Sequence, residues 1–271
     1  YTSLYFVGAG GIGMSALVRY FLAKGYKVAG YDRTQSPLTT ELKTEGLEIV
    51  YEESVESIPD YCRNPETTLV VYTPAIPASH AGLVYFREHG FRVVKRAELL
   101  GLITQSSKGL CFAGTHGKTT TSSMAAHIFH ESPIGCNAFL GGILRNYNSN
   151  LILSEQSPFT VIEADEYDRS FHWLHPYMAV VTATDPDHLD IYGTEEAYLE
   201  SFARFTSLIQ PGGCLIMKKG IKLVPSVKEN VKIYTYSARD GGDFHAGNIR
   251  IGDGTIVFDF VMPEGSVADI E

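Results

Sequence analysis

Two short glycine-rich segments constrain this chain most, because each lies between a strand-like run and a helix-like run. GAGGIG at 8–13 starts where the apolar run LYFVG (4–8) ends, and it leads into MSALVRYFLAKG (14–25). GTHGKTTT at 114–121 starts where GLCFAG (109–114) ends, and it leads into another helix-like segment. Glycines at a strand-to-helix turn let the backbone approach a phosphate closely, and the helix N-terminus attracts its negative charge. We therefore expect two α/β units, each with its own nucleotide-binding loop.

The alternation of strand-like and helix-like segments predicts an α/β fold with parallel sheets. Over 1–104 this pattern predicts a Rossmann-like N-terminal domain. The pattern then restarts, and we expect a P-loop-type central α/β domain over 105–271. The segments FHAGNIRIG and GTIVFDFVM flank GDG (252–254), which predicts a small antiparallel β extension of that domain. The length of 271 residues suits two domains of about 150 residues each.

Composition excludes several classes of function. The formal net charge of −9 disfavours non-specific binding to nucleic acid or to an anionic membrane. No apolar run approaches the roughly 18 residues that a membrane span requires. The four cysteines form no CxxC pair, so neither a zinc ribbon nor a redox pair is visible, and free thiols favour a reducing compartment. We expect a cytoplasmic protein with no nucleic-acid or membrane partner, and its oligomeric state stays open between a monomer and a weak dimer.

The first loop has the GxGxxG pattern, formed by Gly8, Gly10 and Gly13. Asp32 ends the next strand-like run, about where an acid that binds a ribose would lie. Loop, helix and acid together favour a nucleotide diphosphate over a tight turn without a ligand. The motif alone does not choose between NAD and another nucleotide.

The second loop, GTHGKTTT at 114–121, is the stronger indication of phosphate binding. Its glycine N–H groups can surround phosphate oxygens, Lys118 can neutralise the terminal phosphates, and the Thr119 hydroxyl can bind magnesium. Phe112 stands where the first glycine of a GxxxxGK[ST] loop would be, so the loop is two residues shorter than usual. The alternative is that GK[ST] occurs here by chance, without a bound phosphate. The strand-like run before the loop and the helix-like run after it disfavour this alternative.

Two acidic segments follow later strand-like runs. VIEADEYD (161–168) carries Glu163 among other acids, and TATDPDHLDIYG (182–193) carries His188 between aspartates. Because the carboxyl ends of parallel strands meet at one edge of a sheet, both segments can hold metal beside a phosphate loop. The alternatives are a solvated acidic turn for the first segment and a helix-capping turn with an exposed histidine for the second.

Together these motifs resemble the Mur ligase family of bacterial cell-wall synthesis. GTHGKTTT resembles the ATP loop of the family, EADE and DPDHLD resemble its two downstream metal-binding motifs, and GAGGIGMS is most similar to members that join L-alanine to UDP-N-acetylmuramate. The resemblance implies three domains, for the UDP substrate, ATP and the amino acid. The third domain and an HNxxN-type segment are not in this sequence. Because the chain also begins without methionine, we expect a shortened bacterial protein that is inactive alone.

The resemblance also implies roles for individual residues. It assigns the UDP substrate to Gly8, Gly10, Gly11, Ile12, Gly13, Asp32 and Thr73. It assigns ATP to Gly114, Thr115, His116, Gly117, Lys118, Thr119 and Thr120. Thr119 would hold one Mg²⁺ and Glu163 and His188 a second, and the catalytic residues would be Lys118, Glu163 and His188.

The implied reaction activates a carboxylate for amide formation. ATP phosphorylates the carboxylate of UDP-N-acetylmuramate, and the amine of L-alanine then displaces phosphate from the acyl phosphate. No general base for the amine is evident in the sequence. Three other hypotheses remain: a ligase of the same family that recycles murein tripeptide, an NAD-dependent oxidoreductase, and a nucleotide-binding regulatory module without catalysis.

Overall fold

The computed structural model describes residues 1–239 and 241–271. The chain divides into two compact units, one formed by 1–107 with 123–161 and the other by 108–122 with 162–271. The predicted division at 104–105 did not anticipate that 123–161 groups with the first unit. As functional domains, the ranges 1–104 and 105–271 remain a prediction.

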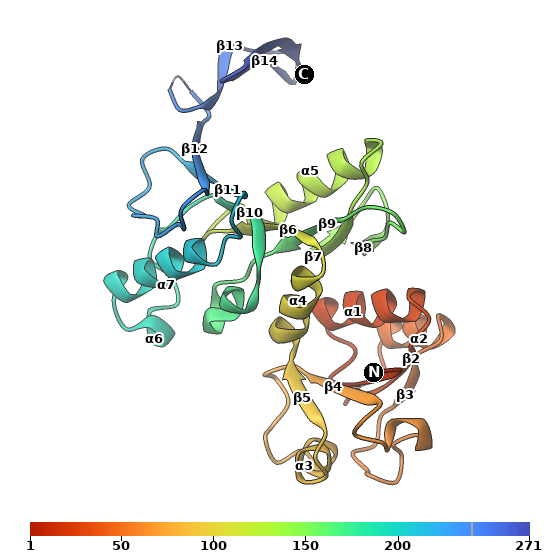
Figure 1. Ribbon diagram of the computed structural model, residues 1–271. Helices are drawn as coiled ribbons and strands as arrows, with labels where there is room; N and C mark the ends of the chain where they lie inside the picture. The colour runs from red at the N-terminus through yellow and green to blue at the C-terminus, as the bar shows by residue number, and fades with distance from the viewer. Residues whose placement is uncertain (240) are drawn as a thin grey trace. The chain divides into compact units, whose positions relative to one another are not determined.

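A five-stranded sheet forms the centre of the first unit, in the order β3-β2-β1-β4-β5. Every neighbouring pair in it is parallel, as the alternating pattern predicted. Its strands are β1 (Ser3–Val7), β2 (Lys27–Tyr31), β3 (Glu48–Val50), β4 (Thr68–Tyr72) and β5 (Arg92–Lys95). The helices between them are α1 (Ile12–Ala23), α2 (Pro37–Thr44), the short 3₁₀ helix η1 (Asp60–Cys62), α3 (Ala81–Glu88) and α4 (Arg96–Gln105). Figure 1 shows these elements in red to yellow.

Local chemistry explains where these elements begin and end. Strand β1 is buried along its whole length, as expected for the central strand of a parallel sheet. Helix α2 begins with Pro37 in the first turn and a reciprocal capping box between Ser36 and Thr39. Gly30 lies so close to its neighbour in β1 that an added Cβ would be 2.6 Å from the Phe6 carbonyl oxygen, which explains a glycine inside β2.

A ten-stranded sheet has the order β15-β14-β13-β12-β11-β10-β6-β9-β7-β8. Its strands are β6 (Lys108–Ala113), β7 (Asn137–Leu144), β8 (Ser149–Ile152), β9 (Phe159–Glu163), β10 (Pro176–Val181), β11 (Cys214–Lys218), β12 (Lys232–Ser237), β13 (Phe244–Gly252), β14 (Thr255–Met262) and β15 (Gly265–Ile270). The accompanying helices are α5 (Lys118–Glu131), the 3₁₀ helix η2 (Tyr167–Trp173), α6 (Leu189–Tyr192) and α7 (Glu195–Ser207).

The end of the second unit is antiparallel, as the two segments around GDG predicted. Strands β13 and β14 pair through a turn at Asp253 and Gly254, which have φ of 51° and 80°. Two consecutive left-handed residues are typical of a tight hairpin turn. The pair β14–β15 continues this extension, drawn in blue in Figure 1. The sequence did not predict β15, nor the antiparallel pair β7–β8.

Helix α7 covers the core of the second unit. Thr194 caps it through a hydrogen bond from the Ala197 N–H, and two glutamates occupy its first turn, where the helix dipole favours negative charge. Its buried face carries Tyr198, Phe202 and Phe205, all fully buried. Among the described residues, none of the helices combines the length and apolar character needed to cross a membrane.

Candidate nucleotide sites

Gly8 opens the first loop in a conformation that suits only glycine. Its φ is +90°, and an added Cβ would lie 2.6 Å from Cγ2 of Thr73. Its N–H donates to the carbonyl oxygen of Tyr31 at 2.8 Å, at the end of the neighbouring strand β2. The structure therefore brings two predicted substrate residues, Gly8 and Thr73, together at the carboxyl edge of the parallel sheet.

Asp32 fixes the middle of the same loop. The Gly10 N–H donates to its Oδ2 at 2.7 Å, and the Thr34 N–H donates to its Oδ1 at 3.2 Å. Gly10 has no room for a side chain, because a Cβ there would lie 2.6 Å from Cγ2 of Thr39. Asp32 therefore has a direct structural role in the loop, whereas its predicted contact with a ribose stays a prediction.

The end of the first loop is open. Gly11 is the N-cap of α1, and no atom of the described residues lies within 4 Å of the position that its Cβ would occupy. Ile12 is the first residue of the helix, and its side chain is 47% exposed. The N–H groups at a helix start have no intrahelical acceptor, so this open end can receive an anion.

Arg96 supplies a cation that the motif did not reveal. A Cβ added to Gly13 would lie 2.4 Å from Nη1 of Arg96, so the guanidinium packs directly on the loop. Arg96 begins α4, immediately after β5, which brings it to the same carboxyl edge as Gly13. A basic residue directly after a parallel strand was the available signal. Its position at that edge makes it a candidate phosphate ligand, because guanidinium and phosphate oxygens pair well.

The segment directly after β10 packs against the second loop. Gly114 has a φ of +137°, and an added Cβ would lie 2.2 Å from Oγ1 of Thr182 and 2.8 Å from the Ala183 nitrogen. The Thr182 hydroxyl donates to the carbonyl oxygen of His116 at 2.5 Å. The Thr115 N–H donates to the Ala183 carbonyl oxygen at 3.1 Å. These contacts give a physical reason for a loop two residues shorter than the usual P-loop.

Thr115 joins this loop to the DPDH segment. Its hydroxyl donates to the carbonyl oxygen of Asp185 at 2.7 Å and lies 2.9 Å from the hydroxyl of Tyr198. Burial raises the pKa of Tyr198, so its hydroxyl stays protonated at neutral pH. The segment after β10 is thereby held against the loop.

Lys118 joins the loop to the EADE segment. Its ammonium group lies 2.9 Å from Oε1 and 2.8 Å from Oε2 of Glu166, and it donates to the Gly114 carbonyl oxygen at 2.8 Å. The Ala164 N–H donates to the Phe112 carbonyl oxygen at 2.8 Å, so the chain leaves β9 beside the end of β6. The loop thus lies against both acidic segments, as expected for strand ends that share one sheet edge.

The remaining predicted ATP residues face solvent. The exposed residues are His116, Gly117, Thr119 and Thr120, and Gly117 has a φ of +82°.

His188 lies at the start of α6 in a left-handed conformation with a φ of 52°, and its Nε2 is 3.8 Å from Oδ2 of Asp187. The described residues contain no group of three or more His, Cys, Asp or Glu side chains arranged to hold a metal. Thr119, Glu163 and His188 lie at or after the ends of three neighbouring strands, β6, β9 and β10, and they supply oxygen and nitrogen atoms of the kinds that divalent cations accept. Their binding of a common metal ion stays a prediction.

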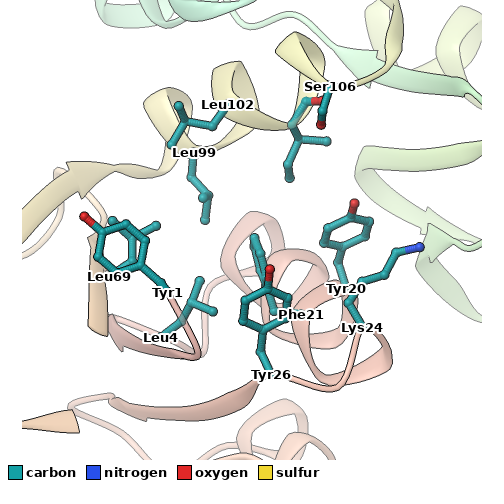
Figure 2. A pocket seen from close by; sticks show the side chains of 11 residues that line it. Tyr1, Leu4, Tyr20, Phe21, Lys24, Tyr26, Leu69, Leu99, Leu102 and Ser106 are labelled. Atoms are coloured by element: carbon teal, nitrogen blue, oxygen red, sulfur yellow. The ribbon is translucent and has the colours of Figure 1, made fainter. Parts of the chain in front are cut away.

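A pocket of about 460 Å³ in the first unit lies away from the glycine loop. Figure 2 shows its mainly apolar lining, with Leu4 and Leu69 on one side and Leu99 on α4. Leu4 and Leu69 lie at the amino ends of β1 and β4, whereas Gly8 and Thr73 follow the carboxyl ends of those strands. The pocket is therefore at the opposite edge of the sheet from the candidate site.

Family comparisons cover nearly the whole chain. Residues 3–108 match the family described as "Mur ligase family, catalytic domain", and residues 112–271 match "Mur ligase middle domain". A relative from Parabacteroides distasonis, named UDP-N-acetylmuramate–L-alanine ligase, is 67% identical over 270 residues, which are 100% of this chain and 58% of the relative. A relative of the same name from Porphyromonas gingivalis is 52% identical over 269 residues, covering 99% of this chain and 59% of its own length.

Solved structures agree on the fold. The UDP-N-acetylmuramate–alanine ligase of Thermotoga maritima superposes with a TM-score of 0.80 at 23% identity, covering 100% of this chain and 60% of its own. The UDP-N-acetylmuramate:L-alanyl-γ-D-glutamyl-meso-diaminopimelate ligase of Neisseria meningitides gives 0.83 at 21% identity, covering 99% of this chain and 86% of its own. The chain spans a little under three fifths of the length of the curated relatives described above. With both family matches and the fold in agreement, this chain belongs to the Mur ligase family.

Proposed function

We propose that this chain is the substrate- and ATP-binding part of a ligase that joins L-alanine to the carboxylate of UDP-N-acetylmuramate. The observation that carries the proposal is 67% identity over the full chain to a ligase of that name, with both glycine loops inside the matched region. Because the chain covers 58% of that relative, we propose that residues outside these 271 bind L-alanine and complete the reaction. Free cysteines favour a reducing compartment, which agrees with the bacterial cytoplasm.

The first loop would bind the UDP diphosphate. The open N-terminus of α1 beyond Gly11 offers N–H donors, and Arg96 offers a guanidinium beside Gly13. Asp32 holds the Gly10 N–H and keeps the loop in one conformation, and a ribose contact is proposed for it as well. The full proposed set is Gly8, Gly10, Gly11, Ile12, Gly13, Asp32, Thr73 and Arg96.

The second loop would bind ATP. Lys118 would neutralise the terminal phosphates, the Thr119 hydroxyl would hold one Mg²⁺, and Glu163 with His188 would hold the second. Magnesium, when bound, would neutralise phosphate charge and stabilise the charge that develops during phosphoryl transfer. Gly114, Thr115, His116, Gly117 and Thr120 complete the proposed loop contacts.

The reaction would proceed in two displacements. A carboxylate oxygen of UDP-N-acetylmuramate attacks the γ-phosphorus of ATP, the bond to the β–γ bridging oxygen breaks, and ADP leaves. The amine of L-alanine then attacks the carbonyl carbon of the acyl phosphate. The bond from that carbon to the phosphate oxygen breaks, phosphate leaves, and the nitrogen loses a proton. Lys118 would contribute by positioning and charge neutralisation, which are the main requirements of phosphoryl transfer.

Calorimetric titration of the 271-residue chain tests this proposal. We expect binding of UDP-N-acetylmuramate and of ATP with Mg²⁺, and no binding of NAD. Binding of NAD without UDP-N-acetylmuramate would favour an oxidoreductase instead. Amide formation from L-alanine by this chain alone would contradict the part of the proposal that requires further residues.

A further inference from the structure

The lysine of the second loop contacts two oxygen-bearing groups of the protein itself. Its ammonium group has three donors. The carboxylate of Glu166, at 2.8–2.9 Å, and the carbonyl oxygen of Gly114, at 2.8 Å, take up most of this capacity. A phosphate that approaches the loop must therefore compete with, or share, these acceptors.

Glu166 is a deeply buried partner. Its side chain is 1% exposed, and that of Lys118 is 16% exposed. A buried carboxylate loses its hydration, so its cation is difficult to remove without leaving an uncompensated charge. The pair also lies 48 residues apart in sequence, so it reflects the fold and not a local turn.

Hydrogen bonds hold the backbone on both sides of the Glu166 side chain. Its carbonyl oxygen accepts hydrogen bonds from the Tyr192 hydroxyl at 2.5 Å and from the Arg169 N–H at 3.0 Å. Two residues earlier, the Ala164 N–H is bonded to the Phe112 carbonyl oxygen in β6. The backbone of Glu166 is thus anchored beside the second loop, which keeps its carboxylate within reach of Lys118.

We propose that Glu166 is a positioning residue that restrains Lys118 and makes nucleotide binding depend on a divalent cation. This inference rests on the proposed binding of ATP at the second loop. Because Glu166 cancels the charge of Lys118, a metal-free polyphosphate meets an ion pair of nearly zero net charge and gains little electrostatic attraction. A cation that accompanies the phosphates supplies the missing positive charge, so the loop favours the metal complex over the free nucleotide.

Glu166→Gln tests this inference, since the amide keeps the size and can still accept a hydrogen bond from Lys118. We expect metal-free ATP, measured in EDTA by calorimetry, to bind about ten-fold more tightly to the variant than to the unaltered chain. The ratio of the dissociation constants without and with Mg²⁺ should fall by a similar factor. Glu166→Asp, which keeps the charge, should retain the original ratio.

Asp168→Asn is the matched control, because it removes one exposed charge from the same segment. It should change metal-free binding less than about two-fold, since an exposed charge is screened by solvent. An unchanged ratio in Glu166→Gln, or an equal gain in Asp168→Asn, would overturn the inference while leaving ATP binding intact. If the unaltered chain binds ATP neither with nor without Mg²⁺, the proposed function fails and this inference with it. Loss of folding in Glu166→Gln, seen as a lost thermal transition, would make Glu166 a structural residue and also overturn it.

Discussion

The two glycine loops differ in where the charged side chains beside them come from. In the first loop an acid, Asp32, holds a backbone N–H of the loop, and the cation comes from Arg96 at the end of another strand. In the second loop the cation, Lys118, belongs to the motif itself, and an acid from another strand end, Glu166, holds that cation. In the first loop both charges therefore come from other strand ends, whereas in the second loop the cation is part of the motif and only the acid comes from another strand end.

A glycine-loop motif does not specify the charged side chains that surround the loop. Glycines and a following helix specify a place where a phosphate can approach. The charges beside each loop come from other strand ends at the same edge of the sheet. In the first sheet the cation follows β5, which is two strands away from β1, and in the second sheet the acid follows β9, which is next to β6.

We expect the largest loss of stability where alanine replaces a glycine that has no room for a Cβ atom. Gly114→Ala should lower the free energy of unfolding by about 3 kcal/mol or more, because its Cβ would meet backbone atoms of Ala183 at a strained φ. Gly8→Ala should cost about 1–3 kcal/mol, since its main obstacle is the movable Thr73 side chain. Gly11→Ala, in open space, is the control and should cost less than about 1 kcal/mol. Urea unfolding measures all three, and equal losses would contradict this reading of the loops.

Lys118→Ala should weaken ATP binding by about 10- to 100-fold, the usual value of a hydrogen-bonded charge. Binding of UDP-N-acetylmuramate should not change, because the proposed site for that ligand is the other loop. Calorimetric titration with each ligand checks both expectations. A parallel loss of both affinities would break the assignment of one ligand to each loop.

Arg96→Ala should weaken binding of the other ligand, UDP-N-acetylmuramate, by a smaller factor than Lys118→Ala weakens ATP binding. We expect about ten-fold weaker binding of UDP-N-acetylmuramate, with ATP binding unchanged, because a half-buried guanidinium beside Gly13 is lost. Arg96→Lys keeps the charge and should recover part of the affinity, although not a planar paired contact. Unchanged binding of the UDP substrate in Arg96→Ala would show that this cation does not serve the loop.

We expect the weakest effect from His80 in the first unit, which should make the free energy of unfolding depend on pH. His80 is 5% exposed, and its Nδ1 accepts a hydrogen bond from the Leu83 N–H at the start of α3. Burial lowers the pKa of His80, against the opposing charge of Glu53. The unfolded chain therefore takes up the proton first as the pH falls below the ordinary histidine value of about 6.5, and the free energy of unfolding decreases.

His80→Asn removes the titrating group and keeps an acceptor for the same N–H. Urea unfolding of both proteins at about pH 7.5 and about pH 5.5 should show a smaller loss in the variant. An identical loss would mean that His80 does not contribute to the acid sensitivity.

The sequence predicted those parts of the fold that local pattern determines. The strand, glycine loop and helix around Gly114 are where the pattern indicated, and so are the parallel first sheet and the hairpin at Asp253. Strands β7 and β8 were missed, because glycines and asparagines interrupt their apolar pattern and pairing with a partner strand compensates for that.

The candidate site was predictable only in its local components. Lys118 and the acidic segments are visible in the sequence, and the structure brings these segments against the loop through Glu166 and Asp185. The particular pairing of Lys118 with Glu166, and of Arg96 with Gly13, depends on how the sheet arranges the strand ends along its edge. Sheet order decides that, and no short motif encodes it.

The assignment of one nucleotide to each glycine loop is tested by titrating the unaltered chain with UDP-N-acetylmuramate and with ATP plus Mg²⁺, separately and then together. We expect one site for each ligand, and saturation with one should leave the other site available. Competition between the two ligands for a single site, or failure of either ligand to bind, would contradict the claim that each glycine loop serves its own nucleotide.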